Sequence, residues 1–229
     1  EEARANLLTH PFVQDARVDR HLPDRLVVEV EERTPVAWLS CPAMGIRPGE
    51  AGNSWLIASD GVPLNCDLDV PEHEHLPLIH AWQLSRLPDG EPVEDRTVLA
   101  AVDVVGRWEI QEALGRSPLR EIRINNSWSL RVICEDDMEI TFATRDLDRQ
   151  FADLEEVYHV VEQKNERLQS VNLVMKKNIA ARTIRFEGTA PSGVADEEMP
   201  APEKPVSDPA GEAARDIRER QLQAILGNS

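Results

Sequence analysis

The sequence predicts an α+β protein: two folded parts rich in antiparallel strands, followed by a C-terminal tail without regular structure. Three observations lead to this prediction. Apolar and polar residues alternate with a period of two in several short runs, which is typical of half-buried antiparallel strands. Two longer runs carry apolar residues at spacings of three and four, which indicates amphipathic helices. Near the C-terminus Pro, Ala, Glu and Ser dominate, and such segments bury too little apolar surface to fold.

The first predicted part, residues 1–64, begins with a short helix, EEARANLL. We expect this helix to end before His10-Pro11, because proline disfavours helix in the preceding residue. Two strands should follow around a turn at Pro23-Asp24, whose residue types suit the centre of a β-turn. The second strand alternates apolar and acidic residues and should therefore be half-buried. The apolar faces would comprise Phe12, Ala16 and Val18 in the first strand and Leu26, Val28 and Val30 in the second.

The rest of the first part should extend the same sheet. Asp60-Gly61 is a strong hairpin signal at its end. Residues 65–92 lack a clear period and should form an irregular connection, with the apolar pair Leu78-Ile79 docked on the second domain. The further strands are expected at Val36, Trp38 and residues 55–57.

The second predicted domain, residues 93–186, opens with a helix that Glu94 or Asp95 can cap and that Gly115 can end. A three-stranded β-meander, a second helix of residues 147–167 and a closing pair of strands should follow. The apolar stripe of the first helix is Val98, Val102, Val105 and Trp108. The meander carries Ile122 and Ile124, then Trp128, Leu130, Val132 and Cys134, then Met138, Ile140 and Phe142. The second helix carries Leu147, Phe151, Leu154, Tyr158 and Val161.

The last predicted segment is an acidic, disordered tail of residues 187–229. Residues 212–226 within it consist of helix-forming types with a few apolar positions. We expect a short helix there, either frayed or used for recognition.

Charge and composition exclude several classes of protein. The chain of 229 residues has a net charge of -17, so it lacks the clustered Lys and Arg that neutralise phosphates, and we expect no nucleic-acid partner. The same surface charge would be repelled by anionic lipids. The three cysteines are scattered without a CxxC pair; we expect buried thiols, although one bridge is possible.

The sequence contains little that predicts catalysis. Cys66, His73, His75 and His80 form the one candidate metal-binding group, but the segment is a loop and no HExxH or CxxC motif completes a site. Solvated histidines are therefore the expected interpretation. No P-loop, GxGxxG or GxSxG motif is present. We expect neither an enzyme nor a cofactor, and a metal-dependent enzyme is the least favoured alternative.

A series of short motifs resembles one known family. They are Pro11-Phe12-Val13, Ala16-Arg17-Val18, Leu22-Pro23-Asp24-Arg25-Leu26, Val30-Glu31-Glu32-Arg33, Pro35-Val36-Ala37-Trp38, and Leu56-Ile57 with Asp60-Gly61-Val62. In this order they resemble the extracytoplasmic part of the FtsQ/DivIB cell-division proteins, whose membrane-proximal domain is a POTRA domain. Further along, the order Leu76-Pro77-Leu78-Ile79, a helix, a meander, a helix and a closing strand pair resembles that of the family's β-domain, which we expect at residues 93–186. The departures are the missing first strand and helix of the POTRA domain, two lysines between Met175 and Asn178, and Asn172 where the family commonly has aspartate.

This resemblance implies a partial POTRA-like module followed by a β-domain. It also implies a non-catalytic divisome scaffold that acts in septation, with partners similar to FtsB and FtsL. The chain would lie on the periplasmic, extracytoplasmic side of the inner (cytoplasmic) membrane, anchored by a single-pass segment absent from this chain. An alternative is another POTRA-bearing component of outer-membrane assembly or secretion, although no second copy of the Leu-Pro-Asp-Arg block is present.

The resemblance further implies that a late strand binds a partner strand. An exposed strand edge offers unpaired N–H and C=O groups that favour β-strand addition. We expect Arg182 or Arg185 to meet an acidic partner group, which would steer the encounter more than it would add affinity. The alternative is a closing strand whose arginines are solvated. The candidate partner-binding residues are Val171, Leu173, Met175, Ala180, Ala181, Arg182, Thr183, Ile184, Arg185 and Phe186.

Overall fold

A computed structural model describes residues 2–50, 52–66 and 73–185 of the chain. These ranges belong to one compact unit, Glu1–Glu187. The tail predicted at 187–229, its helix at 212–226, and the candidate residue Phe186 all lie outside the described residues.

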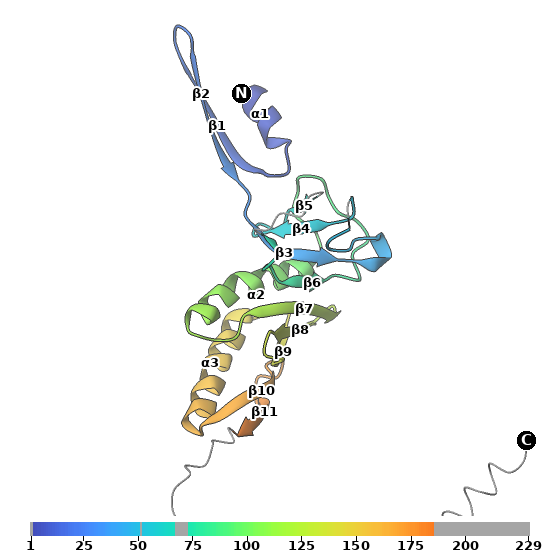
Figure 1. The fold of residues 1–229 in the computed structure, drawn as a ribbon, viewed down its shortest axis with the longest axis vertical. Coiled ribbons are helices and arrows are strands. Elements are labelled where there is room, and N and C mark those ends of the chain that lie inside the picture. The colour runs from blue at the N-terminus through green and yellow to red at the C-terminus, as the bar shows by residue number, and fades with distance from the viewer. Residues whose placement is uncertain (1, 51, 67–72, 186–229) are drawn as a thin grey trace, which may run out of the picture. The chain divides into compact units, whose positions relative to one another are not determined.

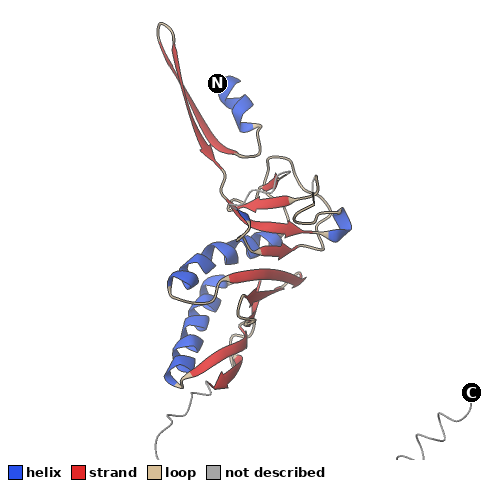
Figure 2. Cartoon of the chain, viewed as in Figure 1, coloured by secondary structure: helices blue, strands red, loops and turns tan. Residues whose placement is uncertain are grey.

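The structure confirms the α+β class (Figures 1 and 2). The helices are α1 (Glu2–Leu8), the 3-10 helix η1 (Pro42–Met44), α2 (Arg96–Ala113) and α3 (Leu147–Gln163). The strands of the first half are β1 (Val13–His21), β2 (Arg25–Glu32), β3 (Pro35–Ser40), β4 (Trp55–Ala58), β5 (Pro63–Asn65) and β6 (Leu78–His80). Those of the second half are β7 (Leu119–Asn126), β8 (Ser129–Cys134), β9 (Glu139–Ala143), β10 (Glu166–Asn172) and β11 (Ala180–Arg185).

The strands form two sheets. β1 and β2 make an antiparallel pair, and the other strands make a nine-stranded sheet in the order β11-β10-β9-β8-β7-β6-β3-β4-β5. The expected meander is present as the antiparallel neighbours β7, β8 and β9. Parallel pairs join β9 to β10, β3 to β6 and β6 to β7. The helices α2 and α3 cover one face of this sheet (Figure 1).

The pairing runs across the domain boundary that the sequence indicated at residue 64. β6, which contains Leu78-Ile79, lies between β3 and β7 and hydrogen-bonds to both. The strands of residues 35–65 therefore belong to the same sheet as the second domain, and they do not extend the β1–β2 pair. Local alternation shows that a segment is a strand, but it carries no information on which distant strand becomes its neighbour.

The β1–β2 hairpin is more exposed than its pattern predicted. Leu26, Val28 and Val30 are 58%, 46% and 45% exposed, so the expected half-buried face of β2 is wrong for the described residues. Only β1 has buried side chains in this pair, at Val13 and Ala16. A two-stranded sheet leaves one broad face without a covering layer, which is why the alternation here does not translate into burial.

One arginine joins the base of the hairpin to the larger sheet. Arg33 is 12% exposed in its side chain, and its Nε lies 2.8 Å from Oδ2 of Asp60. Its Nη1 donates to the carbonyl oxygens of Pro11 at 2.5 Å and Val13 at 2.6 Å. Phe12 packs beside this link against the small apolar cluster of Leu56, Ala58, Val62, Leu64 and Cys66.

The main core lies between the sheet and the two long helices. Asp95 caps α2 as expected, accepting hydrogen bonds from the backbone N–H groups of Thr97 and Val98. Trp108 of α2 and Phe142 of β9 are almost completely buried. Helix α3 ends at Gln163 and not at Arg167, because β10 begins at Glu166. Trp128 is 58% exposed, so its expected place in the core is wrong: it lies in the turn before β8.

Candidate functional site at the edge strand

Strand β11 forms one end of the nine-stranded sheet. It pairs antiparallel with β10 along one side, from Glu166 opposite Arg185 to Asn172 opposite Ala180. Within the described residues, no strand pairs with its other side. The N–H and C=O groups of alternate residues of an antiparallel edge strand point away from the sheet. The strand that the sequence singled out is thus an available edge.

The two faces of β11 differ. Ala181 and Thr183 line a groove beside α3, and alternation therefore directs Arg182 and Ile184 to the opposite face. Ile184 is 51% exposed, and no residue of β11 is buried. Side-chain burial contributes little to holding this strand, so its position depends mainly on the pairing with β10 and on the turn that precedes it.

The structure separates the other predicted site residues into two groups. Val171 and Leu173 have buried side chains. Val171 lies in β10, which is paired on both sides, with β9 and with β11. Leu173 directly follows β10, and both side chains belong to the core. Met175 is 61% exposed and lies in the turn between β10 and β11, not in a strand. Period-two patterns did not reveal which of the closing strands was internal.

The two arginines of β11 have different surroundings. The Nε of Arg185 lies 3.6 Å from Oε1 of Glu166 on the neighbouring strand. The Thr183 hydroxyl donates to the other carboxylate oxygen of Glu166 at 2.6 Å, and this bond lowers the pKa of Glu166. Arg182 is exposed and has no ion pair among the described residues. Arg182 is therefore the more available cation of the pair.

Sequence reasoning missed the groove itself. It has a volume of about 330 Å³ and lies between the C-terminal half of α3 and the segment 179–183. Val160, off the predicted stripe of α3, is 47% exposed at this groove. An apolar residue outside the buried stripe was the signal that could have revealed it. The remaining lining consists of Asp153, Glu156, Val157, Val161, Lys164, Glu166, Ile179, Ala181 and Thr183.

The residues considered for chemistry are dispersed. Among residues 2–50, 52–66 and 73–185, no three His, Cys, Asp or Glu side chains form a group that could hold a metal ion. His80 Nε2 lies 2.8 Å from Oε2 of Glu121, and the ring of His73 packs against Trp38. All three cysteines are buried, and burial raises the pKa of the Cys134 thiol to about 12, which disfavours the nucleophilic thiolate.

None of the described helices is long and apolar enough to cross a membrane.

Comparisons with known proteins agree with the motifs. The model of the POTRA domain, FtsQ-type, matches residues 1–33. Over 184 residues the chain is 23% identical to Cell division protein FtsQ of Anaeromyxobacter sp. (strain K), an alignment that covers 80% of this chain and 59% of that protein. The chain thus spans 59% of the length of the curated relative it matches. Both matches therefore show similarity to FtsQ-type sequences.

Proposed function

We propose that this chain is a non-catalytic scaffold of bacterial cell division, and that it recruits partners similar to FtsB and FtsL by β-strand addition at β11. The observation that carries the proposal is the position of β11: it ends the nine-stranded sheet, and one of its sides has no neighbour among the described strands. Both the FtsQ-type POTRA match and the similarity to FtsQ favour a division role over other POTRA-bearing assemblies.

Backbone pairing supplies the physical basis of the proposal. A partner strand laid along β11 would satisfy the outward N–H and C=O groups of Ala180–Arg185, extending the sheet by one strand. Main-chain hydrogen bonds would provide affinity, and side chains on the two faces would provide selectivity. A partner strand would meet Ile184 on one face and the α3 groove on the other.

Charge would contribute to the selection of the partner. Arg185 is already paired with Glu166, so we assign the contact with an acidic partner group to Arg182. An exposed pair of this kind contributes on the order of 0.2–1 kcal/mol and mainly accelerates association. The binding site is proposed to include Ala180, Ala181, Arg182, Thr183, Ile184 and Arg185, with Met175 of the preceding turn.

The same proposal covers location and domain organisation. Residues 1–33, which the POTRA model matches, form the membrane-proximal module, and the nine-stranded sheet forms the partner-binding domain. The scaffold is proposed to be a single-pass protein of the inner membrane, with the described residues on the periplasmic side.

A pair of proline variants tests strand addition. Successive N–H groups of a strand point to opposite sides, so of Thr183→Pro and Ile184→Pro one removes a bond to β10 and the other removes a bond to the partner. We expect the variant that loses the bond to the partner to keep the melting temperature of the parent. It should weaken binding of the FtsB-like ectodomain at least about tenfold.

Thr183→Ala and Ile184→Ala are the matched controls, because they remove the same side chains and keep the N–H groups. Binding would be measured by surface plasmon resonance against the purified ectodomain from the same organism. If both proline variants bind as tightly as their alanine counterparts, strand addition at β11 is wrong.

A further inference from the structure

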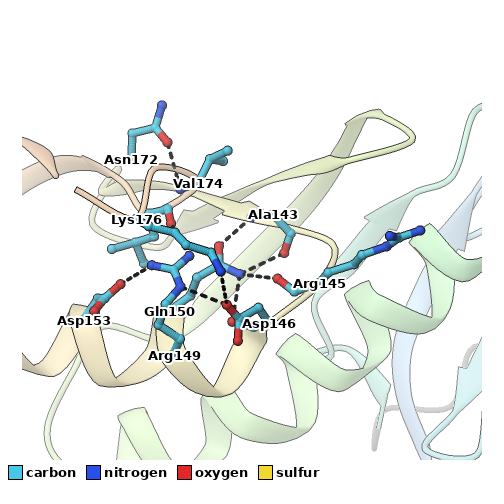
Figure 3. A network of polar contacts seen from close by, with 10 residues as sticks. Ala143, Arg145, Asp146, Arg149, Gln150, Asp153, Asn172, Val174 and Lys176 are labelled. Atoms are coloured by element: carbon cyan, nitrogen blue, oxygen red, sulfur yellow. Dashed lines mark hydrogen bonds and ion pairs between the residues drawn. The ribbon is translucent and has the colours of Figure 1, made fainter. Parts of the chain in front are cut away.

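The first turn of α3 holds a network of polar contacts that reaches the turn before β11 (Figure 3). Asp146 precedes the helix with φ of 62°, in the left-handed region, and its side chain makes no capping hydrogen bond to the helix. Asp at this position normally accepts from the free N–H groups of the first helical turn. The left-handed region is uncommon for residues other than glycine, although Asp and Asn adopt it more often than most. An uncommon conformation that abandons the usual cap points to another use of the carboxylate.

That carboxylate binds two cations from different segments. Its Oδ2 lies 3.1 Å from Nε of Arg149 and 3.5 Å from Nζ of Lys176. Lys176 belongs to the segment that connects β10 to β11. Asp146 thus links the beginning of α3 to the connecting turn.

Arg149 makes the second and more buried link. Its side chain is 23% exposed, and besides Asp146 it pairs through Nη1 with Asp153 one helical turn later. Its Nη2 donates to the carbonyl oxygen of Leu173 at 3.1 Å. Leu173 directly follows β10, is fully buried, and donates its own N–H to the Thr141 carbonyl at 2.9 Å. One guanidinium therefore joins the carboxylates of Asp146, just before α3, and Asp153, within α3, to the backbone at which the chain leaves the sheet.

The turn from Leu173 to Ile179 determines where β11 begins. Since no side chain of β11 is buried, the strand has few contacts of its own that would fix its position. Anchoring the start of the turn restricts the hairpin that β10 and β11 form.

We propose that Arg149 is a positioning residue: by holding the Leu173 carbonyl it orders the β10–β11 turn and presents β11 to the added strand. This inference rests on the proposed function. Ordering the edge before binding removes an entropic cost that the partner interaction would otherwise have to offset. Arg149 itself touches no partner in this scheme, because its guanidinium is already occupied by Asp146, Asp153 and Leu173.

The test compares Arg149→Ala with Arg107→Ala. Arg107 of α2 also pairs with two carboxylates, Asp103 and Asp148. It makes no hydrogen bond or ion pair to the described residues of the β10–β11 turn, so it is a control for the loss of surface ion pairs. Amide hydrogen exchange of residues 173–185 is measured in the free protein. We expect exchange to rise about tenfold in Arg149→Ala, which corresponds to about 1.4 kcal/mol, and to stay at the parent rate in Arg107→Ala.

Two conservative variants keep the test informative if Arg149→Ala folds poorly. Arg149→Lys retains the charge with fewer donors and should give an intermediate exchange rate. Asp146→Asn removes the carboxylate charge, while asparagine tolerates the left-handed backbone, and should accelerate exchange in the same residues. Affinity for the FtsB-like ectodomain should fall about fivefold to tenfold in Arg149→Ala and partly recover in Arg149→Lys.

The outcomes separate this inference from the proposed function. Unchanged exchange at 173–185 in Arg149→Ala would overturn the positioning role whatever the binding result. Faster exchange in Arg149→Ala without a loss of affinity would also overturn the positioning role. In either case, if the proline variants lose binding, strand addition at β11 still holds. Parent affinity in both Arg149→Ala and the proline variants would overturn both proposals.

Discussion

The side chain of Gln150 in α3 forms hydrogen bonds with the end of β9 and with the residues just before the helix. Replacing Gln150 tests how much these buried hydrogen bonds contribute to stability. Gln150 is completely buried. Its Oε1 accepts from the N–H of Ala143 at 2.6 Å, and its Nε2 donates to the carbonyl of Arg145 at 2.8 Å. Longer bonds of 3.2 Å reach the carbonyls of Ala143 and Asp146. Figure 3 shows these contacts converging on one amide.

Gln150→Met preserves the length of the side chain and removes its hydrogen bonds. The Ala143 N–H and at least one carbonyl would lose their partners, and an unsatisfied buried group costs about 1–3 kcal/mol. We therefore expect a loss of about 2–3 kcal/mol in the free energy of unfolding. For a domain of this size, that loss lowers the melting temperature by about 4–12 °C.

Gln150→Glu adds a pH dependence with a defined sign. The carboxylate could still accept from Ala143, but its charge would face the carbonyl oxygens of Arg145 and Asp146. Burial and these oxygens favour the protonated acid, so the pKa in the folded state lies above the unfolded value of about 4.3. The variant is then closest to the parent below about pH 4.3 and loses stability as pH rises through the folded-state pKa. At a pH above both values, each unit of difference between the folded-state and unfolded-state pKa lowers the free energy of unfolding by about 1.4 kcal/mol.

Urea denaturation at pH 4 and pH 7 measures both effects, with the parent protein measured at each pH to correct for its other titrating groups. Gln150→Glu should be less stable than Gln150→Met at pH 7, and the difference should shrink at pH 4. If the two variants have equal stability at pH 7, Gln150 is not buried against these carbonyls and the described network is incorrect.

Two further predictions concern the core and the hairpin link. Trp108→Ala should lower the free energy of unfolding by about 3–5 kcal/mol, because the ring is 1% exposed. Trp128→Ala should change it by less than about 0.5 kcal/mol; urea denaturation of both variants checks the contrast, and equal effects would contradict the assigned burial. Arg33→Ala removes the bonds to Asp60, Pro11 and Val13 and should accelerate proteolysis within residues 2–33 about tenfold. Limited proteolysis followed by mass spectrometry measures the cleavage rate in each part of the chain. If cleavage in residues 73–185 accelerates equally, Arg33 does not specifically join the hairpin to the larger sheet.

Local features of the fold could be predicted from the sequence. The Asp95 cap and the stripe that includes Val98 and Trp108 identified α2, because capping and helical periodicity depend on residues within one or two turns. The Asp60-Gly61 turn likewise identified the β4–β5 hairpin, in which Gly61 has φ of 83°. These signals are contained in the segment that they describe.

Features that depend on distant segments could not be predicted. The place of β6 between β3 and β7 joins the two expected domains into one sheet, and no local pattern specifies such neighbours. The exposure of Val28 and Val30 depends on the absence of a covering layer among the described residues, while their alternation is the same as in a half-buried strand.

The candidate site likewise combines local features that the sequence predicts with features that depend on distant segments. The strand at Ala180–Arg185 was predicted from its composition and from the family resemblance, but its position at the end of the sheet required the strand order. Arg149 and Asp153 are visible in the sequence as a pair four residues apart, a common arrangement on a helix surface. Only the fold brings that pair to the carbonyl of Leu173.

Amide hydrogen exchange in the complex with the FtsB-like ectodomain reports on strand addition at β11 residue by residue. If a partner strand is added at β11, binding slows exchange at alternate residues of Ala180–Arg185, those whose N–H groups point away from β10, while β5 at the opposite end of the sheet keeps its free rates. Protection of another surface with unchanged exchange along β11 would refute strand addition at this edge.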